Sequence, residues 1–301
     1  MSQGQKTSIF QAKTISEARL WQQSEIALTG QTLGFVPTMG NLHKGHGSLI
    51  AEAKKQCDKV AVSIFVNPMQ FGPNEDFEKY PRTLAADLEL CAELGTDIVF
   101  TPSVSELYGR GLEQSSFVDV PEELTNKLCG TFRPGHFRGV ATVVSKLFNI
   151  IQAQKAFFGE KDYQQLLVIK RMAEDLSFAV QVIGLPTVRE ADGLAMSSRN
   201  QYLTSEQREL APVIYQILTQ LKNQVRTQNL PIKTALETAK ADLATIGTDK
   251  LKFDLQYLDA CNPNTLEILS NDTQNPDLHP EIVFLIAAKL NEVRLIDNLK
   301  A

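Results

Sequence analysis

Cysteine, histidine and tryptophan are scarce in this chain, whose 301 residues include four cysteines, four histidines and one tryptophan. The cysteines lie far apart, form no Cys-x-x-Cys pair and have no histidine at zinc-finger spacing; they are Cys57, Cys91, Cys129 and Cys261. This pattern argues against a disulfide framework and against a zinc finger. It predicts reduced thiols that are partly buried.

Long apolar runs are absent as well. No stretch approaches the length that a membrane-spanning helix needs, and Met1–Thr7 is polar, without the apolar core of a signal peptide. A basic surplus is also missing, since the net charge is −5. General nucleic-acid binders normally carry such a surplus. The sequence therefore predicts a cytoplasmic protein with no membrane or nucleic-acid partner.

What the chain does contain is a regular alternation of apolar segments. Apolar residues make up 43% of it and charged residues 22%, which is ordinary for a packed globular protein. Short β-branched or aromatic runs alternate with longer amphipathic ones, a pattern typical of a parallel sheet with helices on both faces. The expected strands are 33–36, 60–66, 97–100, 156–158 and 178–183, and the expected helices are 14–27, 48–53, 81–94, 139–152 and 162–175. We predict an α/β fold, with a Rossmann-like, doubly wound parallel sheet in a domain over residues 1–186.

The pattern changes near Pro186. Two long amphipathic stretches, 204–225 and 232–244, are followed by an alternating segment at 253–258 and an apolar run at 281–290. This order predicts a second, smaller α+β domain over 187–301. We expect that domain to act as a lid, with its first segment, 188–202, lying against the ligand cleft.

A pair of histidines follows the first expected strand. His43 and His46 lie within the run Pro37–His46, which contains a glycine turn and leads into a helix. The N-terminus of a helix carries unpaired N–H groups and partial positive charge, so it suits phosphate, and imidazoles can add donors there. Taken alone, the pair is equally compatible with a structural or metal-binding role. Residues 47–50 offer no third ligand at helical spacing, which argues against zinc.

Four further polar segments lie at expected strand ends or helix starts, and each also has an ordinary interpretation. They are Asn67–Gly72 (a turn), Arg133–Gly139 (an anion-steering or merely helix-capping loop), Gly159–Asp162 (a charged turn) and Ala195–Asn200 (a surface loop). Ligands in open parallel sheets bind beyond the carboxyl ends of the strands. We therefore expect the side chains that follow strand ends to converge in one cleft: His43, His46, Asn67, Gln70, Gly159 and Lys161.

In this order along the chain, the segments resemble the pantothenate synthetase (pantoate–β-alanine ligase) family of the nucleotidyltransferase superfamily. The resemblance covers nearly the whole length and is carried by Pro37–His46, Phe65–Gly72, Arg133–Val140, Phe158–Leu166 and Val188–Tyr202. It implies a homodimeric ligase that uses ATP as co-substrate and Mg²⁺ as cofactor. Such an enzyme condenses pantoate with β-alanine to pantothenate through pantoyl adenylate, and releases AMP and pyrophosphate.

The resemblance also implies roles for single residues. His46, His43 and Lys161 would be catalytic, with His46 as the proton donor. Gln70, Gln165 and Asn67 would bind pantoate or β-alanine. ATP would be held by Met39, Gly40, Asn41, Leu42, His43, Lys44, Gly45, His46, Gly159, Glu160, Lys161, Asp162, Val188, Met196, Ser197, Ser198 and Arg199. No side chain is assigned as a metal ligand, because phosphates can supply most of the ligands of Mg²⁺.

Three other interpretations stay open at this point. The chain could be a nucleotidyltransferase that leaves the nucleotide on its product, a fragment of a class I aminoacyl-tRNA synthetase, or a non-catalytic nucleotide sensor. Arg199 is the only cation of segment 196–199, where class I synthetases carry a lysine, and this favours the small ligase. The products of turnover distinguish all of these classes.

Overall fold

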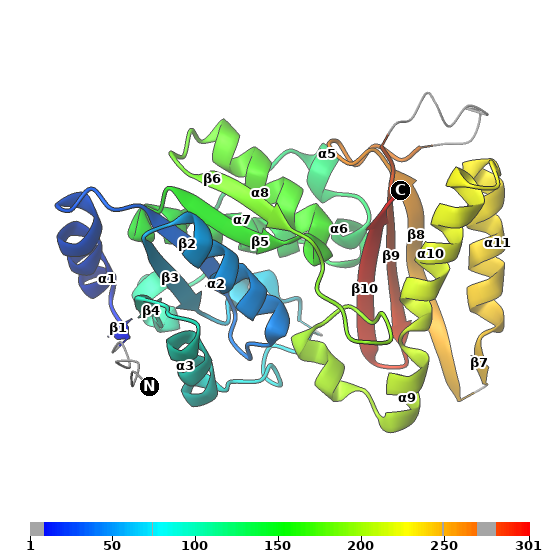
Figure 1. Ribbon diagram of the computed structural model, residues 1–301, viewed down its shortest axis with the longest axis horizontal. Coiled ribbons are helices and arrows are strands. Elements are labelled where there is room, and N and C mark those ends of the chain that lie inside the picture. Colours follow the sequence, from blue (N-terminus) through cyan, green and yellow to red (C-terminus); the bar gives the residue numbers. More distant parts are fainter. Residues whose placement is uncertain (1–8, 74, 249, 270–280) are drawn as a thin grey trace, which may run out of the picture. The chain divides into compact units, whose positions relative to one another are not determined.

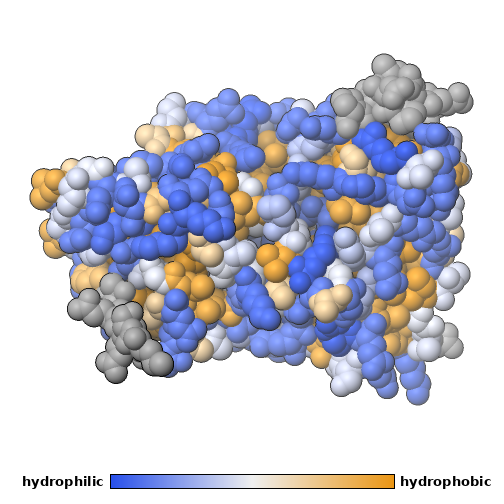
Figure 2. Space-filling model, in the orientation of Figure 1, coloured by the Kyte–Doolittle hydropathy of each residue, from blue (hydrophilic) through white to orange (hydrophobic). Residues whose placement is uncertain are grey.

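The computed structural model describes residues 9–73, 75–248, 250–269 and 281–301, which form two compact units (Figure 1). The first unit contains the described residues up to Glu160 together with Val168–Pro186. The second contains Lys161–Leu167 together with the described residues from Thr187 onward. Within these ranges no helix combines the length and apolar character needed to cross a membrane. Hydrophilic side chains predominate on the face in Figure 2, with apolar groups in scattered patches.

A six-stranded sheet forms the centre of the first unit. Its order is β1-β4-β3-β2-β5-β6, and every neighbouring pair is parallel. The prediction of a doubly wound, Rossmann-like sheet is therefore confirmed. The strands are β1 (Phe10–Ala12), β2 (Leu33–Thr38), β3 (Lys59–Ile64), β4 (Ile98–Phe100), β5 (Lys155–Gly159) and β6 (Gln181–Leu185).

Helices cover both faces of this sheet. They are α1 (Ile15–Gln22), α2 (Lys44–Gln56), α3 (Leu84–Glu93), α7 (His136–Ile151) and α8 (Tyr163–Asp175), with the short α4 (Val104–Leu107), α5 (Glu122–Thr125) and α6 (Cys129–Phe132) between them. On one face, Val60 and Val62 of β3 pack in a cluster with residues of α2 and α3. On the other, Phe35 of β2 and Phe158 of β5 make edge-on contacts with Phe148 of α7. Apolar side chains on both faces explain why these strands are near-continuous apolar runs.

The chain switches direction across the sheet between β2 and β5. It runs from β2 outward through β3 and β4, and then resumes on the other side of β2 with β5. Pairing between these two strands is limited to Gly34 with Lys155 and Phe35 with Ala156, although both strands continue further. The carboxyl ends of β2 and β5 therefore form no ladder with each other. This is the position where open α/β sheets bind ligands.

Pro37 helps to explain why this pairing stops. The carbonyl of Leu33 accepts the N–H of Gln154, so the backbone groups of Leu33 point toward β5. In a strand every second residue points the same way, so Pro37 also faces β5. Proline has no N–H to donate to a neighbouring strand. A proline in this central strand is tolerated because the ladder on that side has already ended.

The second unit contains a four-stranded antiparallel sheet of order β10-β9-β8-β7. Helices α10 (Val213–Arg226) and α11 (Ile232–Thr245) pack against it, α10 on β9 and β10 and α11 on β8 (Figure 1). Leu218 and Leu221 of α10 share a buried core with Ala239 of α11 and Ile286 of β9. The strands are β7 (Gly247–Thr248), β8 (Leu251–Cys261), β9 (Val283–Leu290) and β10 (Val293–Lys300). The prediction of a smaller α+β part is confirmed.

Several expected boundaries were wrong. The helix expected from Pro81 begins at Leu84, and the helix expected over 204–225 is two helices, α9 (Ser205–Leu210) and α10, which are separated at Pro212. Proline removes a helical N–H and crowds the preceding turn, so the break has a local cause. The long α7 begins at His136, so the expected loop Arg133–Gly139 supplies its first turn. Strands β1, β7 and β10 were missed.

Candidate active site

The histidine pair occupies the turn from β2 into α2, next to the switch point of the sheet. Gly40 and Asn41 both have positive φ angles, 84° and 49°, which lets the chain reverse direction sharply after Met39. Glycine adopts such angles without strain and asparagine tolerates them. A side chain at Gly40 would approach Ile64 of β3 to 3.0 Å. The predicted strand, glycine turn and helix start are thus confirmed.

Both imidazoles are tied to the first turn of α2 through their Nδ1 atoms. His43 is the N-cap residue, and its Nδ1 accepts the N–H of Gly45 at 3.1 Å. Nδ1 of His46 accepts the N–H of His43 at 3.3 Å, and the ring centroids lie 4.2 Å apart. An Nδ1 that accepts a hydrogen bond carries no proton, so each neutral ring has its proton on Nε2. The pair therefore presents Nε2–H donors at a helix N-terminus, which is an arrangement that suits a phosphoryl oxygen.

A buried carboxylate that sequence reasoning missed holds this turn in place. Asp87 of α3, 2% exposed, accepts the N–H groups of Asn41 at 3.0 Å and Leu42 at 2.8 Å. The hydroxyl of Thr83 donates to the same carboxylate at 3.2 Å. A signal existed in the sequence, since Asp87 interrupts the apolar stripe of Leu84, Leu88 and Cys91. An acid at such a position is expected to have dedicated partners.

Asn67 and Gln70 lie in the turn after β3, within η2 (Pro68–Gln70) and its cap. Asn67 is 1% exposed; its amide donates to Oε1 of Gln70 at 3.1 Å and to the carbonyl of Gly139 at 3.0 Å. Its Oδ1 accepts the hydroxyl of Tyr108 at 2.9 Å. The amide of Gln70 lies 3.0 Å from Sδ of Met39, so the structure brings Gln70 to the glycine turn. Asn67 is therefore placed to orient Gln70, and both polar atoms of its side-chain amide form hydrogen bonds with other residues of the protein.

The loop that carries Gln70 is clamped by the residues before α7. Arg133 forms a double hydrogen bond with Glu75, at 2.7 Å from Nε and 2.6 Å from a terminal nitrogen. A second terminal nitrogen of Arg133 donates to Nε2 of His136 at 3.0 Å, so Nδ1 of His136 carries the proton and donates to the carbonyl of Gln70 at 2.8 Å. Arg133 is thus paired with a carboxylate, and the structure gives this basic segment a role that neither interpretation included, which is to fix the Gln70 loop.

Glycine at position 139 lets α7 approach this loop closely. A Cβ atom there would lie 2.4 Å from the carbonyl oxygen of Met69 and 2.6 Å from the nitrogen of Gln70. Such distances are far inside van der Waals contact, so any larger residue would push the Gln70 turn away.

The remaining predicted ATP and substrate residues follow β5 or lie in the second unit. Gly159 ends β5 and Glu160 begins the short helix η3 (Glu160–Asp162), both next to the switch point. Lys161, whose side chain is 18% exposed, lies 3.7 Å from the carboxylate of Asp162. The carbonyl of Lys161 accepts the amide of Asn298 in β10 at 2.9 Å. Gln165 is half-buried in the first turn of α8.

A hairpin precedes the Ser-Ser-Arg segment. The N–H of Met196 donates to the carbonyl of Val188 at 3.0 Å, so these two predicted ATP contacts lie side by side. Ser197 caps η4 (Ser198–Tyr202), since its hydroxyl accepts the N–H of Arg199 at 3.3 Å. Met196, Ser197, Ser198 and Arg199 are all partly exposed. Partly exposed polar side chains thus lie on a capped turn of the second unit.

Comparison with known proteins decides the family. A family model described as Pantoate-beta-alanine ligase matches residues 11–300. The chain belongs to the pantoate–β-alanine ligase family. It is 52% identical over 269 residues to the pantothenate synthetase of Acinetobacter baumannii, an alignment that covers 89% of this chain and 90% of that protein.

Two solved structures of this family are similar to the chain. The crystal structure of pantothenate synthetase from Thermus thermophilus is 44% identical, with a TM-score of 0.87, and the match covers 97% of this chain and 99% of that one. The pantoate-beta-alanine ligase of Francisella tularensis, crystallised with Beta-gamma ATP and beta-alanine, is 36% identical, with a TM-score of 0.77 and 97% of each chain covered. The predicted family and enzyme class are therefore confirmed.

Side chains that could bind a metal ion, and the four cysteines, are the remaining features of the sequence analysis to compare with the structure. Among the described residues, no group of three histidine, cysteine, aspartate or glutamate side chains is placed to hold a metal ion. All four cysteines are buried thiols outside any disulfide, in agreement with the prediction. The Mg²⁺ cofactor stays a prediction.

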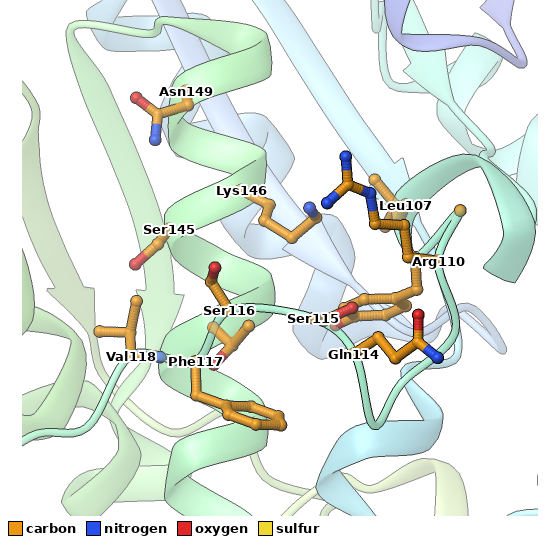
Figure 3. Close-up of a pocket in the computed structure, with 13 residues that line it drawn as sticks. Leu107, Arg110, Gln114, Ser115, Ser116, Phe117, Val118, Ser145, Lys146 and Asn149 are labelled. Atoms are coloured by element: carbon orange, nitrogen blue, oxygen red, sulfur yellow. Dashed lines mark hydrogen bonds between the residues drawn. The ribbon is translucent and has the colours of Figure 1, made fainter.

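A separate hollow of about 370 Å³ lies in the first unit, beside α7. Lys146 and Arg110 direct their cationic ends toward one another at its rim, with Gln114 and Ser115 nearby (Figure 3). Tyr108 also lines it, and its ring lies under the ammonium of Lys146, 5.6 Å from Nζ to the ring centroid. Through the Tyr108 hydroxyl this hollow adjoins Asn67, which is the residue that orients Gln70.

Proposed function

We propose that the chain is an ATP-dependent ligase that condenses pantoate with β-alanine to pantothenate, in two steps. The carboxylate of pantoate attacks the α-phosphate of ATP, which gives pantoyl adenylate and pyrophosphate. The amine of β-alanine then attacks the activated carbonyl and AMP leaves. The observation that carries this proposal is the pair of imidazoles, each held through Nδ1 so that Nε2–H donors meet a helix N-terminus beyond β2.

In the first step negative charge builds on the oxygens of the α-phosphate. His43 and His46 would donate hydrogen bonds from Nε2 to these oxygens, and the first turn of α2 would add its partial positive charge. Both rings are fixed before the reaction by backbone bonds, so no reorganisation is needed when the charge develops. One preorganised donor of this kind is worth roughly 3–4 kcal/mol in the transition state. His46 is the residue that we assign as proton donor.

Pyrophosphate is the leaving group of this step, and we assign its stabilisation to the second unit. Lys161 supplies a point charge, and Ser197, Ser198 and Arg199 supply hydroxyl and guanidinium donors. Adenosine would contact Gly159, Asp162 and the backbone of Val188. When bound to the phosphates, Mg²⁺ would neutralise part of their charge.

Pantoate binding is assigned to two carboxamides. Gln70 and Gln165 would hold its hydroxyl and carboxylate groups without adding charge, and Gln70 would also lie near β-alanine. Asn67 would act through Gln70, since its amide donates to Oε1 of Gln70. With Oε1 engaged in this way, the NH₂ group of Gln70 is oriented as the donor that faces the glycine turn.

Turnover assays test the proposal directly. Protein is mixed with ATP, Mg²⁺, pantoate and β-alanine, and the products are followed by mass spectrometry while each component is omitted in turn. We expect AMP and pantothenate only in the complete mixture, and ATP–pyrophosphate exchange that requires pantoate but not β-alanine. A product that retains the nucleotide would indicate a nucleotidyltransferase instead, and ATP binding without turnover would indicate a nucleotide sensor.

The proposed homodimer and the cytoplasmic location complete the assignment. Sedimentation equilibrium of the purified chain distinguishes a dimer from a monomer over a range of concentrations. A protein that stays monomeric at micromolar concentration would contradict the proposed assembly without affecting the proposed chemistry.

A further inference from the structure

Two neighbouring residues of the last strand hold two segments that the proposed function places on the pyrophosphate of ATP. We propose that Asp297 and Asn298 of β10 form a positioning element that fixes Lys161 relative to the hairpin 188–196 and thereby to Ser197–Arg199. This inference rests on the proposed function. It assigns a task in the adenylation step to residues far from any of the motifs in the sequence.

The first arm of this element is an ion pair. Arg189 pairs with Ala195 across the hairpin, and its guanidinium meets both carboxylate oxygens of Asp297, at 2.5 and 2.9 Å. The side chain of Asp297 is 2% exposed and that of Arg189 is 17% exposed. A two-point contact of this kind fixes orientation as well as distance.

Arg189 makes further contacts that leave it little freedom. Its guanidinium also donates to the carbonyl of Gly193 at 3.1 Å, across the hairpin, and to the carbonyl of Asn298 at 3.2 Å. Its guanidinium carbon also lies over the ring of Tyr215 in α10, 3.8 Å from the ring centroid. Arg189 therefore joins both ends of the hairpin turn to the sheet and to a helix. Lysine could not reproduce this, because it lacks the planar fork.

The second arm begins at the next residue. The amide of Asn298 donates to the carbonyl of Lys161 at 2.9 Å, and its own N–H donates to Oδ1 of Asp297 at 2.7 Å. Strand β10 also contacts η4, which contains Ser198 and Arg199. Adjacent residues on one strand cannot move independently, so the Lys161 turn and the hairpin share a single anchor.

The two-step reaction provides a test that separates positioning from general stability. Pyrophosphate leaves in the first step and takes no part in the second. Loss of the anchor should therefore slow adenylation and leave the attack of β-alanine on pantoyl adenylate unchanged. A purely structural role would reduce both steps together.

The experiment uses Asn298→Ala to remove the Lys161 arm and Arg189→Lys to weaken the hairpin arm. Pantoate-dependent ATP–pyrophosphate exchange measures the first step, and pantothenate formation from chemically prepared pantoyl adenylate and β-alanine measures the second. We expect exchange to fall at least about tenfold, since a misplacement of about 1 Å can cost up to roughly 100-fold. The second step should stay within about twofold. In the exchange assay, KM for pantoate should stay unchanged.

Asp259→Asn serves as the matched control, since Asp259 is a half-buried carboxylate in β8 of the same sheet, 4.0 Å from Lys240. It should leave both steps unchanged. If Asn298→Ala does not fold, as judged by thermal unfolding, Arg189→Lys carries the test. Parallel loss of both steps, or unchanged exchange in folded variants, would overturn the inference. Wild-type protein without exchange would instead overturn the proposed function, and this inference with it.

Discussion

Nδ1 of His46 accepts the backbone N–H of His43 at 3.3 Å, so the side chain that we assign as proton donor also caps the helix on which it stands. The bond keeps Nδ1 unprotonated and directs Nε2–H away from the backbone. The imidazole of His46 thus has both a capping role and the catalytic role that we assign to it. Loss of the ring without a replacement cap affects both, so the two effects are separated by a variant that keeps the capping bond.

His46→Ala should abolish pantoate-dependent ATP–pyrophosphate exchange, with a loss of about 100-fold or more, because it removes a preorganised donor. It should also lower the free energy of unfolding by about 0.5–2 kcal/mol, since a capping bond is lost. His46→Gln is the matched control, because glutamine at this helix position can still reach back to the N-cap N–H. We expect it to restore stability but not exchange. Near-normal exchange in either variant would refute the role of His46.

Asp87→Asn tests the buried carboxylate that holds the glycine turn. One of its oxygens would become an NH₂ group facing a backbone N–H, which should lower the free energy of unfolding by about 1–3 kcal/mol. Exchange should fall as well, because the turn carries His43. Glu89→Gln, an exposed change on the same helix, should alter neither property. Denaturant unfolding and the exchange assay provide the measurements, and wild-type values for Asp87→Asn would argue against this role.

Gln70→Ala should impair the use of pantoate far more than the binding of ATP. We expect KM for pantoate to rise about tenfold or more, because a donor to the substrate is lost, as in other sites built around hydrogen bonds to a substrate. Tyr108→Phe removes the hydroxyl that holds Asn67, and should produce a smaller change in the same direction. Calorimetry with ATP and kinetics with pantoate make the comparison. A selective loss of ATP affinity in Gln70→Ala would contradict the assignment.

The Glu75–Arg133 clamp should make the stability of the Gln70 loop sensitive to acid. Burial raises the pKa of Glu75, but the hydrogen bonds and charge of Arg133 outweigh it, so the pKa lies below its usual value of 4.5. A carboxylate with a lowered pKa stabilises the fold fully above its unfolded pKa and loses that contribution as the pH falls through its folded pKa. The stability difference between wild type and Glu75→Gln should therefore shrink below about pH 4.5. A difference that is independent of pH from 3 to 7, as measured by urea unfolding at about unit intervals, would contradict it.

The buried thiols should resist alkylation in the native protein. Burial raises the pKa of Cys91 to about 11 and also raises that of Cys57, so little thiolate forms at neutral pH. Iodoacetamide at pH 8 should label these two cysteines only after denaturation, as read by mass spectrometry of peptides. Rapid labelling of Cys91 in folded protein would show that this part of the core opens readily.

Local sequence signals predicted the elements that carry the candidate site, but not the contacts between remote residues that hold these elements in place. The turn from β2 into α2 was predictable, because strand, glycine and helix start follow one another within a few residues. Asp87 was missed because its partners, Asn41 and Leu42, lie in another segment of the chain. The helix break has a local signal in Pro212, whereas strand β10 depends on its pairing with β9.

The sequence by itself determined the alternation of strands and helices, the strand, glycine turn and helix start at His43, and the family, because each depends on residues close together or on a colinear pattern. Only the tertiary structure decided that each imidazole accepts a backbone N–H at Nδ1, that Asn67 turns its amide to Gln70, and that Asp297 meets Arg189. These relationships join groups that are remote along the chain, and their geometry is set by packing, which no local pattern encodes.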